Sequence, residues 1–246
     1  MEIKTKAIVI GAQDKGESDK KVKFFSVDQG IFEATVRGVK KQGAKLTSCT
    51  FSFAFVEIVL AEKNGFFTVT SSEMIEPFFD LSLNLEKYGL ASLALEIVSE
   101  IARSDQNNAV VFVELLKLFY LLCNEDDAGL KLVWCKWAWD MLAIAGFLLN
   151  LSKCSVCGKS ACGAEKLFVD MESGSVTCDV HRPEKGIVSD ISSGVFAVLS
   201  GFDRVELEDM KGRRIKNENV TSDEVFEFLK NLFQGILGKK FKSILF

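Results

Sequence analysis

The stretch Phe51-Ser-Phe-Ala-Phe-Val-Glu-Ile-Val-Leu60 is rich in aromatic and β-branched residues and predicts a β-strand. Asn64-Gly65, a dipeptide typical of tight hairpin turns, separates it from a second such stretch, Phe66-Phe-Thr-Val-Thr70. Strands are also expected upstream, at residues 4–10, 21–27 and 31–37. Five short strands joined by turns favour a small antiparallel barrel. The five-stranded OB-fold is the first candidate, and an SH3-like barrel has a similar pattern.

The composition changes after Pro77, where strand alternation gives way to leucine-rich helical spacing. Asn84 is placed to cap the first helix, and Thr221-Ser-Asp-Glu224 is a capping-box sequence that opens the last one. The expected helices cover about 84–103, 109–123, 130–149, 189–202 and 221–237. We therefore predict an α+β, multi-domain chain, with an OB-fold domain at 1–77 and a helical domain at 78–246 that contains a zinc-binding insertion at about 150–186.

The insertion carries two pairs of potential metal ligands. Cys154-Ser-Val-Cys157 is a C-x2-C pair, and Cys178-Asp-Val-His181 is a C-x2-H pair that includes the only histidine of the chain. Two such pairs at this separation are typical of a tetrahedral zinc site. Four protein ligands leave no position for water, so the site is expected to be structural rather than catalytic. Cys162 lies between the pairs and could displace His181 or remain a free thiol.

The amino-acid composition and net charge of the chain limit the classes of function that it can have. The 246-residue chain has a net charge of −4, so its overall charge does not indicate nucleic-acid binding. Seven cysteines in a metal-like pattern, without a secretory signal, fit a reducing compartment such as the cytoplasm. The sequence predicts no transmembrane span, because its most apolar stretch is interrupted by Lys136 and Asp140. It contains no catalytic motif that we can identify, and we do not expect an enzyme.

One polar segment stands out, Arg37-Gly-Val-Lys40-Lys41-Gln-Gly-Ala-Lys45. It has four positive charges, and no acidic residue occurs between Glu33 and Glu57. A basic loop on an OB-fold is a common binding site for single-stranded nucleic acid, since its cations attract phosphates. An ordinary solvated loop would have the same composition. The candidate nucleic-acid contacts are Arg37, Lys40, Lys41 and Lys45 in this loop and Lys20, Lys21 and Lys23 in the second predicted strand.

Several short motifs, in this order and spacing, resemble the bacterial RecO family over nearly the whole chain. Gly16-Glu-Ser-Asp19 is similar to a G-E-x-D turn of that family, and Arg37-Gly-Val-Lys-Lys41 is similar to its R-G-x-R/K-K segment. Ala145-Gly-Phe147 leads to the first cysteine pair as the family's G-Y/F approach does, although the proline that follows it in the family is absent. Leu237-Gly-Lys-Lys-Phe-Lys-Ser243 is similar to the C-terminal L-G-x-x-L-K-S segment.

The resemblance implies an N-terminal OB-fold, a helical C-terminal domain with a zinc site, and a non-enzymatic role in recombinational DNA repair. RecO-like proteins bind single- and double-stranded DNA, anneal complementary strands and, with RecR, help to load RecA onto DNA coated by single-strand-binding protein. This implies a cytoplasmic, nucleoid-associated protein. Many relatives have cysteine where this chain has His181, and a Cys3His set remains chemically sound. Two alternatives are a protein–protein adaptor with little DNA binding and a zinc-ribbon RNA-binding or transcription accessory protein.

Overall fold

The computed structural model describes residues 2–102, 108–147, 149–160, 166–216 and 218–243. Its internal contacts divide the chain into two compact units, Met1–Cys123 and Asn124–Phe246. The first unit contains the predicted barrel together with the helices that follow it as far as residue 123. Each unit is described below by itself.

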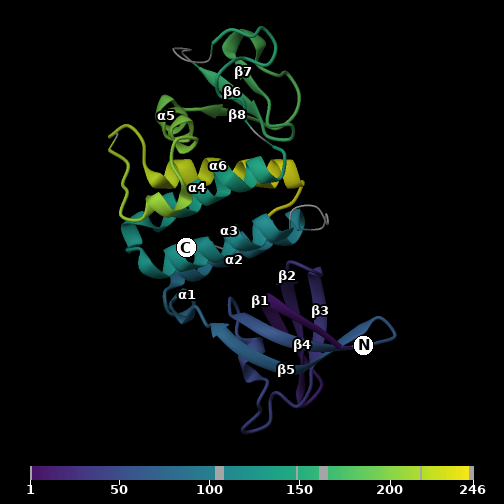
Figure 1. The fold of residues 1–246 in the computed structure, drawn as a ribbon. Helices are drawn as coiled ribbons and strands as arrows, with labels where there is room; N and C mark the ends of the chain where they lie inside the picture. The colour runs from purple at the N-terminus through teal and green to yellow at the C-terminus, as the bar shows by residue number, and fades with distance from the viewer. Residues whose placement is uncertain (1, 103–107, 148, 161–165, 217, 244–246) are drawn as a thin grey trace. The chain divides into compact units, whose positions relative to one another are not determined.

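The N-terminal part of the first unit is a closed five-stranded barrel (Figure 1). Its strands are β1 (Glu2–Lys15), β2 (Asp19–Ser26), β3 (Gly30–Val36), β4 (Phe55–Lys63) and β5 (Phe66–Glu76). They follow the order β1-β2-β3-β5-β4, and β1 closes the barrel on β4. All neighbours are antiparallel except β3 and β5, which pair in parallel over a short stretch. The predicted OB-like barrel is confirmed.

The turns of the barrel explain where the strands begin and end. Asn64 and Gly65 have φ angles of 53° and 77°, the left-handed backbone that a two-residue hairpin turn requires, so this predicted turn is confirmed. The predicted start of the fourth strand at Phe51 is wrong. A short 3-10 helix (Thr47–Thr50) precedes it, and buried Phe53 has a φ of 71°, which interrupts extended backbone until β4 begins at Phe55.

Helices α1 (Phe79–Leu83), α2 (Leu85–Ile101) and α3 (Asn108–Asn124) follow the barrel. The predicted cap of α2 is confirmed, because the Asn84 side chain accepts the backbone N–H of Lys87. Barrel aromatics pack on these helices: the Phe53 ring lies 5.6 Å from that of Phe119, and the Phe25 ring lies 5.4 Å from that of Phe112. Aromatic packing therefore joins α3 to the barrel.

The second unit is built on α4 (Asp127–Ile144), α5 (Ser193–Phe202) and α6 (Ser222–Leu237). The Trp134 ring of α4 packs 4.9 Å from that of Phe226 on α6, and the predicted capping box of Thr221 and Glu224 is confirmed. Helix α4 ends earlier than predicted, since Gly146 has a left-handed φ of 83° soon after it. Among the described helices, none has the length and apolar character needed to span a bilayer.

A three-stranded sheet completes this unit, in the order β7 (Val176–Cys178), β6 (Leu167–Asp170) and β8 (Val188–Ile191). Strand β8 occupies residues predicted as the start of the α5 helix, which instead begins at Ser193 behind its cap Ser192. We call residues 153–191 the Cys/His module, because this segment contains the sheet and both predicted ligand pairs.

Candidate nucleic-acid interface and metal site

The basic loop, residues 37–45, is held against the β1–β2 turn by hydrogen bonds from its backbone. The Gly38 N–H donates to Oδ1 of Asp19 at 2.8 Å, and the hydroxyl of Ser18 donates to the same oxygen at 2.9 Å. Gly38 has a φ of 64°, which a residue with a side chain adopts only with strain. The Gly38 hydrogen bond lowers the pKa of the Asp19 carboxyl below its ordinary value. Asp19 is therefore a positioning residue for the loop.

Lys40 and Val39 fix the loop further. The Lys40 N–H donates to the carbonyl of Ser18 at 3.1 Å, and its Nζ donates to the carbonyl of Gly16 at 3.2 Å. The same Nζ forms an ion pair with Asp14 at 2.8 Å, which lowers the pKa of that carboxyl. Val39 is buried in the barrel core. The structure thus brings together two motifs that lie about twenty residues apart in the sequence.

The basic residues predicted to contact nucleic acid differ in whether their side chains already form ion pairs. Arg37, Lys41 and Lys45 are exposed, and within the described residues their side chains form no ion pair or hydrogen bond. Lys40 is paired with Asp14, and Lys21 is paired with Glu33 at 2.5 Å. These exposed pairs are weak and can be exchanged for phosphate contacts.

The three lysines of β2 do not share one face of the strand. Lys21 and Lys23 lie on the side opposite buried Val22, whereas Lys20 lies on the same side as Val22, at the end of the strand. Lys20 pairs in register with Asp14, next to the basic loop. Sequence reasoning missed the roles of Asp14 and Asp19. The Gly16-Glu-Ser-Asp19 motif contains Asp19, but the sequence does not show that its side chain accepts a hydrogen bond from Gly38.

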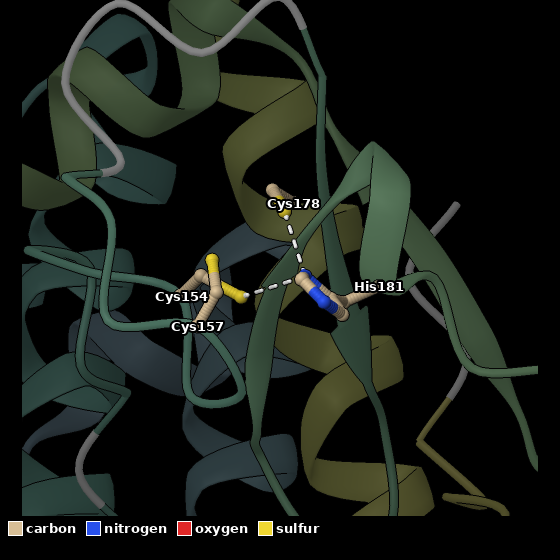
Figure 2. Close-up of side chains that lie close together, drawn as sticks. All are labelled: Cys154, Cys157, Cys178 and His181. Atoms are coloured by element: carbon tan, nitrogen blue, oxygen red, sulfur yellow. Dashed lines mark hydrogen bonds between the residues drawn. The ribbon is translucent and has the colours of Figure 1, made fainter.

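The four predicted metal ligands come together in the Cys/His module (Figure 2). The possible ligand atoms of Cys154, Cys157, Cys178 and His181 all lie within 4.8 Å of one another. The Nδ1 atom of His181 is 3.3 Å from Sγ of Cys178 and 3.9 Å from Sγ of Cys154. The predicted cluster is thus formed by two residues of a turn before β6, the last residue of β7, and His181 in the short 3-10 helix (Asp179–His181) that follows β7.

The local backbone explains why these side chains converge. The N–H of Gly158 donates to the carbonyl of Cys154, and Gly158 has a φ of 68°, so the C-x2-C segment closes into a tight turn. The N–H of Ser155 donates to the carbonyl of Val176 at 2.8 Å and ties this turn to β7. Backbone N–H groups of Cys157 and Cys178 also point at the Cys154 sulfur and lower the pKa of its thiol to about 6.

The cluster fits a tetrahedral metal. Ligand bonds of about 2.3 Å to sulfur and about 2.0–2.1 Å to nitrogen place neighbouring ligand atoms about 3.5–3.8 Å apart. The two sulfur–nitrogen distances of 3.3 and 3.9 Å bracket that separation. The lowered pKa of Cys154 favours the thiolate that a metal requires, whereas burial raises the pKa of Cys178. The cluster can hold a metal ion. Cys162, the alternative ligand, lies outside the described residues.

Comparisons with known proteins agree with this architecture. Residues 1–78 match the family model described as Recombination protein O N terminal, and residues 82–244 match Recombination protein O C terminal. The DNA repair protein RecO of Syntrophobacter fumaroxidans is 24% identical, over 98% of this chain and 95% of its own length. The DNA repair protein RecO of Clostridium novyi is 26% identical, over 98% of this chain and 91% of its own. With both family models matched and the barrel and helices in the corresponding order, the chain belongs to the RecO family of DNA repair proteins.

Proposed function

We propose that the protein is a recombinational repair mediator that binds single- and double-stranded DNA and anneals complementary strands. The observation that carries this proposal is the basic loop 37–45, which is fixed on the barrel by Asp19 while Arg37, Lys41 and Lys45 remain exposed. Cations held at fixed positions can bind successive phosphates of either strand without reading the bases. Partial neutralisation of two strands would let them approach and pair.

The mediator role needs no catalytic residue. The single histidine of the chain lies in the Cys/His cluster, so no histidine is left for general acid–base chemistry. We therefore infer a non-enzymatic protein. Its partners in this proposal are RecR, single-strand-binding protein and, indirectly, RecA, with DNA as the common substrate. A protein with this substrate works in the cytoplasm at the nucleoid.

We also propose that the Cys/His cluster binds one zinc ion with a structural role. Three thiolates and one imidazole are a usual zinc set, and four protein ligands leave no position for a reacting water. We retain residues 1–77 as the DNA-binding domain and 78–246 as the helical domain, with the zinc-binding insertion at about 150–186. The two family models, which meet between residues 78 and 82, support this boundary.

A strand-annealing assay tests the proposal. Two complementary oligonucleotides, one carrying a fluorophore and the other a quencher, are mixed with the protein, with and without RecR and single-strand-binding protein. We expect annealing faster than the spontaneous rate, and a large loss of that rate in the triple variant Arg37→Ala/Lys40→Ala/Lys41→Ala. Unaccelerated annealing would contradict the proposal. A preference for RNA over DNA strands would instead support the RNA-binding alternative.

One observation favours an adaptor role as a second candidate function. A groove of about 310 Å³ in the second unit has an apolar lining that includes Leu132, Val198 and Phe202, and Arg213 and Lys216 also line it. Apolar lining beside cations suits a short partner segment with apolar and acidic side chains. Partner binding without annealing, measured with the same proteins, would favour the adaptor.

A further inference from the structure

A pocket of about 530 Å³ opens on the barrel next to the basic loop. It lies between the end of β1, strands β2 and β3, and the β4–β5 turn, and its lining includes Asp14, Lys15, Lys21, Phe32 and Phe66. Asp14 is also the ion-pair partner of Lys40, so the pocket and the basic loop share a rim. Its volume is within the range of about 300–1,000 Å³ for pockets that accept small organic ligands.

Phe66 differs from the other aromatic residues of the barrel. The Phe32 ring centroid lies 5.4 Å from that of Phe24 and 5.6 Å from that of Phe67, so Phe32 is packed among other barrel aromatics. The Phe66 side chain follows the tight Asn64-Gly65 turn and is 77% exposed. Within the described part of the chain, its ring contacts no other aromatic ring. A single exposed apolar residue is ordinary. At the mouth of a pocket lined by lysines, it offers an open aromatic face to a ligand.

The other aromatics that the sequence places near the basic loop cannot serve this purpose. Phe24, Phe25 and Phe53 are fully buried. Phe55 packs on Phe112 of α3, and Phe51 packs on Phe79 of α1. Phe66 is therefore the barrel aromatic that the fold leaves available for stacking in this pocket.

The charges of the pocket are arranged around this apolar face. Nζ of Lys15 donates to the hydroxyl of Thr35 at 3.0 Å, which fixes a cation at one wall. Lys21 is paired with Glu33 at another part of the lining, and Lys40 offsets the charge of Asp14. The acidic groups of the lining are thus offset by lysines. The Lys15 ammonium interacts with the Asp19 carboxylate through its charge and forms no ion pair within the described residues. Cations that flank an aromatic ring match a ligand with a flat π system between two phosphates.

We propose that this pocket receives one unstacked base of single-stranded DNA, with Phe66 as the stacking platform and Lys15 and Lys21 on the flanking phosphates. The bases of a duplex are stacked on one another and cannot present a face to Phe66, whereas the basic loop can bind phosphates of either form. The pocket therefore favours single strands over duplexes. This inference rests on the proposed function and adds the strand form that the site prefers.

Fluorescence anisotropy with three labelled ligands at one salt concentration tests the inference. The ligands are an oligothymidylate of about 15 nucleotides, an abasic strand of equal length and a duplex of equal length. Phe66→Ala should weaken oligothymidylate binding about 5- to 150-fold, the equivalent of one stacked base. Binding of the abasic strand and of the duplex should stay within about twofold of wild type, since both depend on phosphate contacts.

Two controls accompany this variant. Phe66→Trp keeps a stacking surface and should retain oligothymidylate affinity, and its added fluorescence should be quenched by this ligand and not by the abasic strand. Tyr120→Ala removes an aromatic side chain that is 63% exposed on α3 and does not line the pocket, so it should bind all three ligands as wild type does.

Three results would overturn the inference. Phe66→Ala with wild-type affinity for oligothymidylate refutes stacking. Equal weakening for the abasic strand and the duplex means that Phe66 supports the fold of the site rather than a base. In both cases the proposed function stands if Arg37→Ala/Lys40→Ala/Lys41→Ala weakens binding of all three ligands. A wild-type protein that binds none of them contradicts the proposed function as well.

Discussion

Gly235 of α6 lies directly against the backbone of the Cys/His module. A Cβ atom at this position would overlap the carbonyl oxygen of Met171 and lie 2.8 Å from its carbonyl carbon. Non-bonded carbons favour about 3.5–4.0 Å, so α6 and the module would have to separate by roughly 0.7 Å or more. Overpacking of this kind lowers the free energy of unfolding by about 1–3 kcal/mol. The higher helix propensity of alanine offsets about 1 kcal/mol of this loss. Gly235→Ala should therefore lower the free energy of unfolding by about 1 kcal/mol.

Gly201 of α5 provides a matched control, because a Cβ atom there meets nothing within 4 Å. Gly201→Ala should raise the free energy of unfolding by about 0.4–1 kcal/mol through the unfolded chain. Urea unfolding, followed by tryptophan fluorescence in the presence of a small excess of zinc, measures both variants. All three tryptophans lie on α4, so the signal reports the second unit. A Gly235→Ala protein as stable as Gly201→Ala would refute the close packing of α6 on Met171.

Three further predictions concern the metal site, a buried charge and the basic loop. Cys178→Ser should reduce the metal content, measured by elemental analysis, from the proposed one zinc per chain to none and lower the unfolding midpoint; a metal content equal to that of the wild type would contradict the ligand set. Arg214→Ala leaves the buried Glu125 carboxylate without its cation. Breaking a buried ion pair lowers the free energy of unfolding by about 3–5 kcal/mol. Because Arg214 is 35% exposed, we expect a loss of about 1–3 kcal/mol, measured by urea unfolding. An unchanged unfolding midpoint would refute this prediction. In the folded protein the pKa of Asp19 is lowered from its ordinary value of 3.8, mainly by the Gly38 hydrogen bond. The ionised carboxylate therefore stabilises the fold at pH values above 3.8, and this stabilisation is lost as the pH falls through the pKa of the folded protein. Hydrogen exchange should then show the Gly38 amide losing protection in that acidic range, and Asp19→Asn should remove the dependence.

Much of the fold could be predicted because local signals and tertiary packing agree. The Asn64-Gly65 turn, the Asn84 cap and the Thr221 capping box are each encoded within four residues, and all three are present. The C-x2-C and C-x2-H pairs are encoded in the same local way, and the cluster they predicted is formed. Local backbone requirements of this kind can be read from a sequence without knowing what packs against them.

The errors occur where packing overrides local preference. Phe53 takes a left-handed φ of 71°, because its ring is buried against Tyr88 and Phe119. No pattern in the sequence predicts this backbone conformation. Residues 189–191 have the sequence pattern of a helix start, yet they pair with β6 as part of the edge strand β8. The exposure of Phe66 depends likewise on how the barrel closes. Residues 1–77 contain eight phenylalanines, and the sequence offers no means to choose among them.

Salt dependence of single-stranded DNA binding tests the central claim most directly. Each phosphate neutralised contributes about 0.7 to the slope of log affinity against log salt. Arg37→Ala/Lys40→Ala/Lys41→Ala should reduce the magnitude of that slope by about 2, or by about 1.4 if Lys40 stays with Asp14. The triple variant Lys159→Ala/Lys166→Ala/Lys185→Ala changes the net charge equally at exposed positions of the Cys/His module and should keep the wild-type slope. Equal slopes for the wild type and the basic-loop variant would contradict DNA binding by the basic loop.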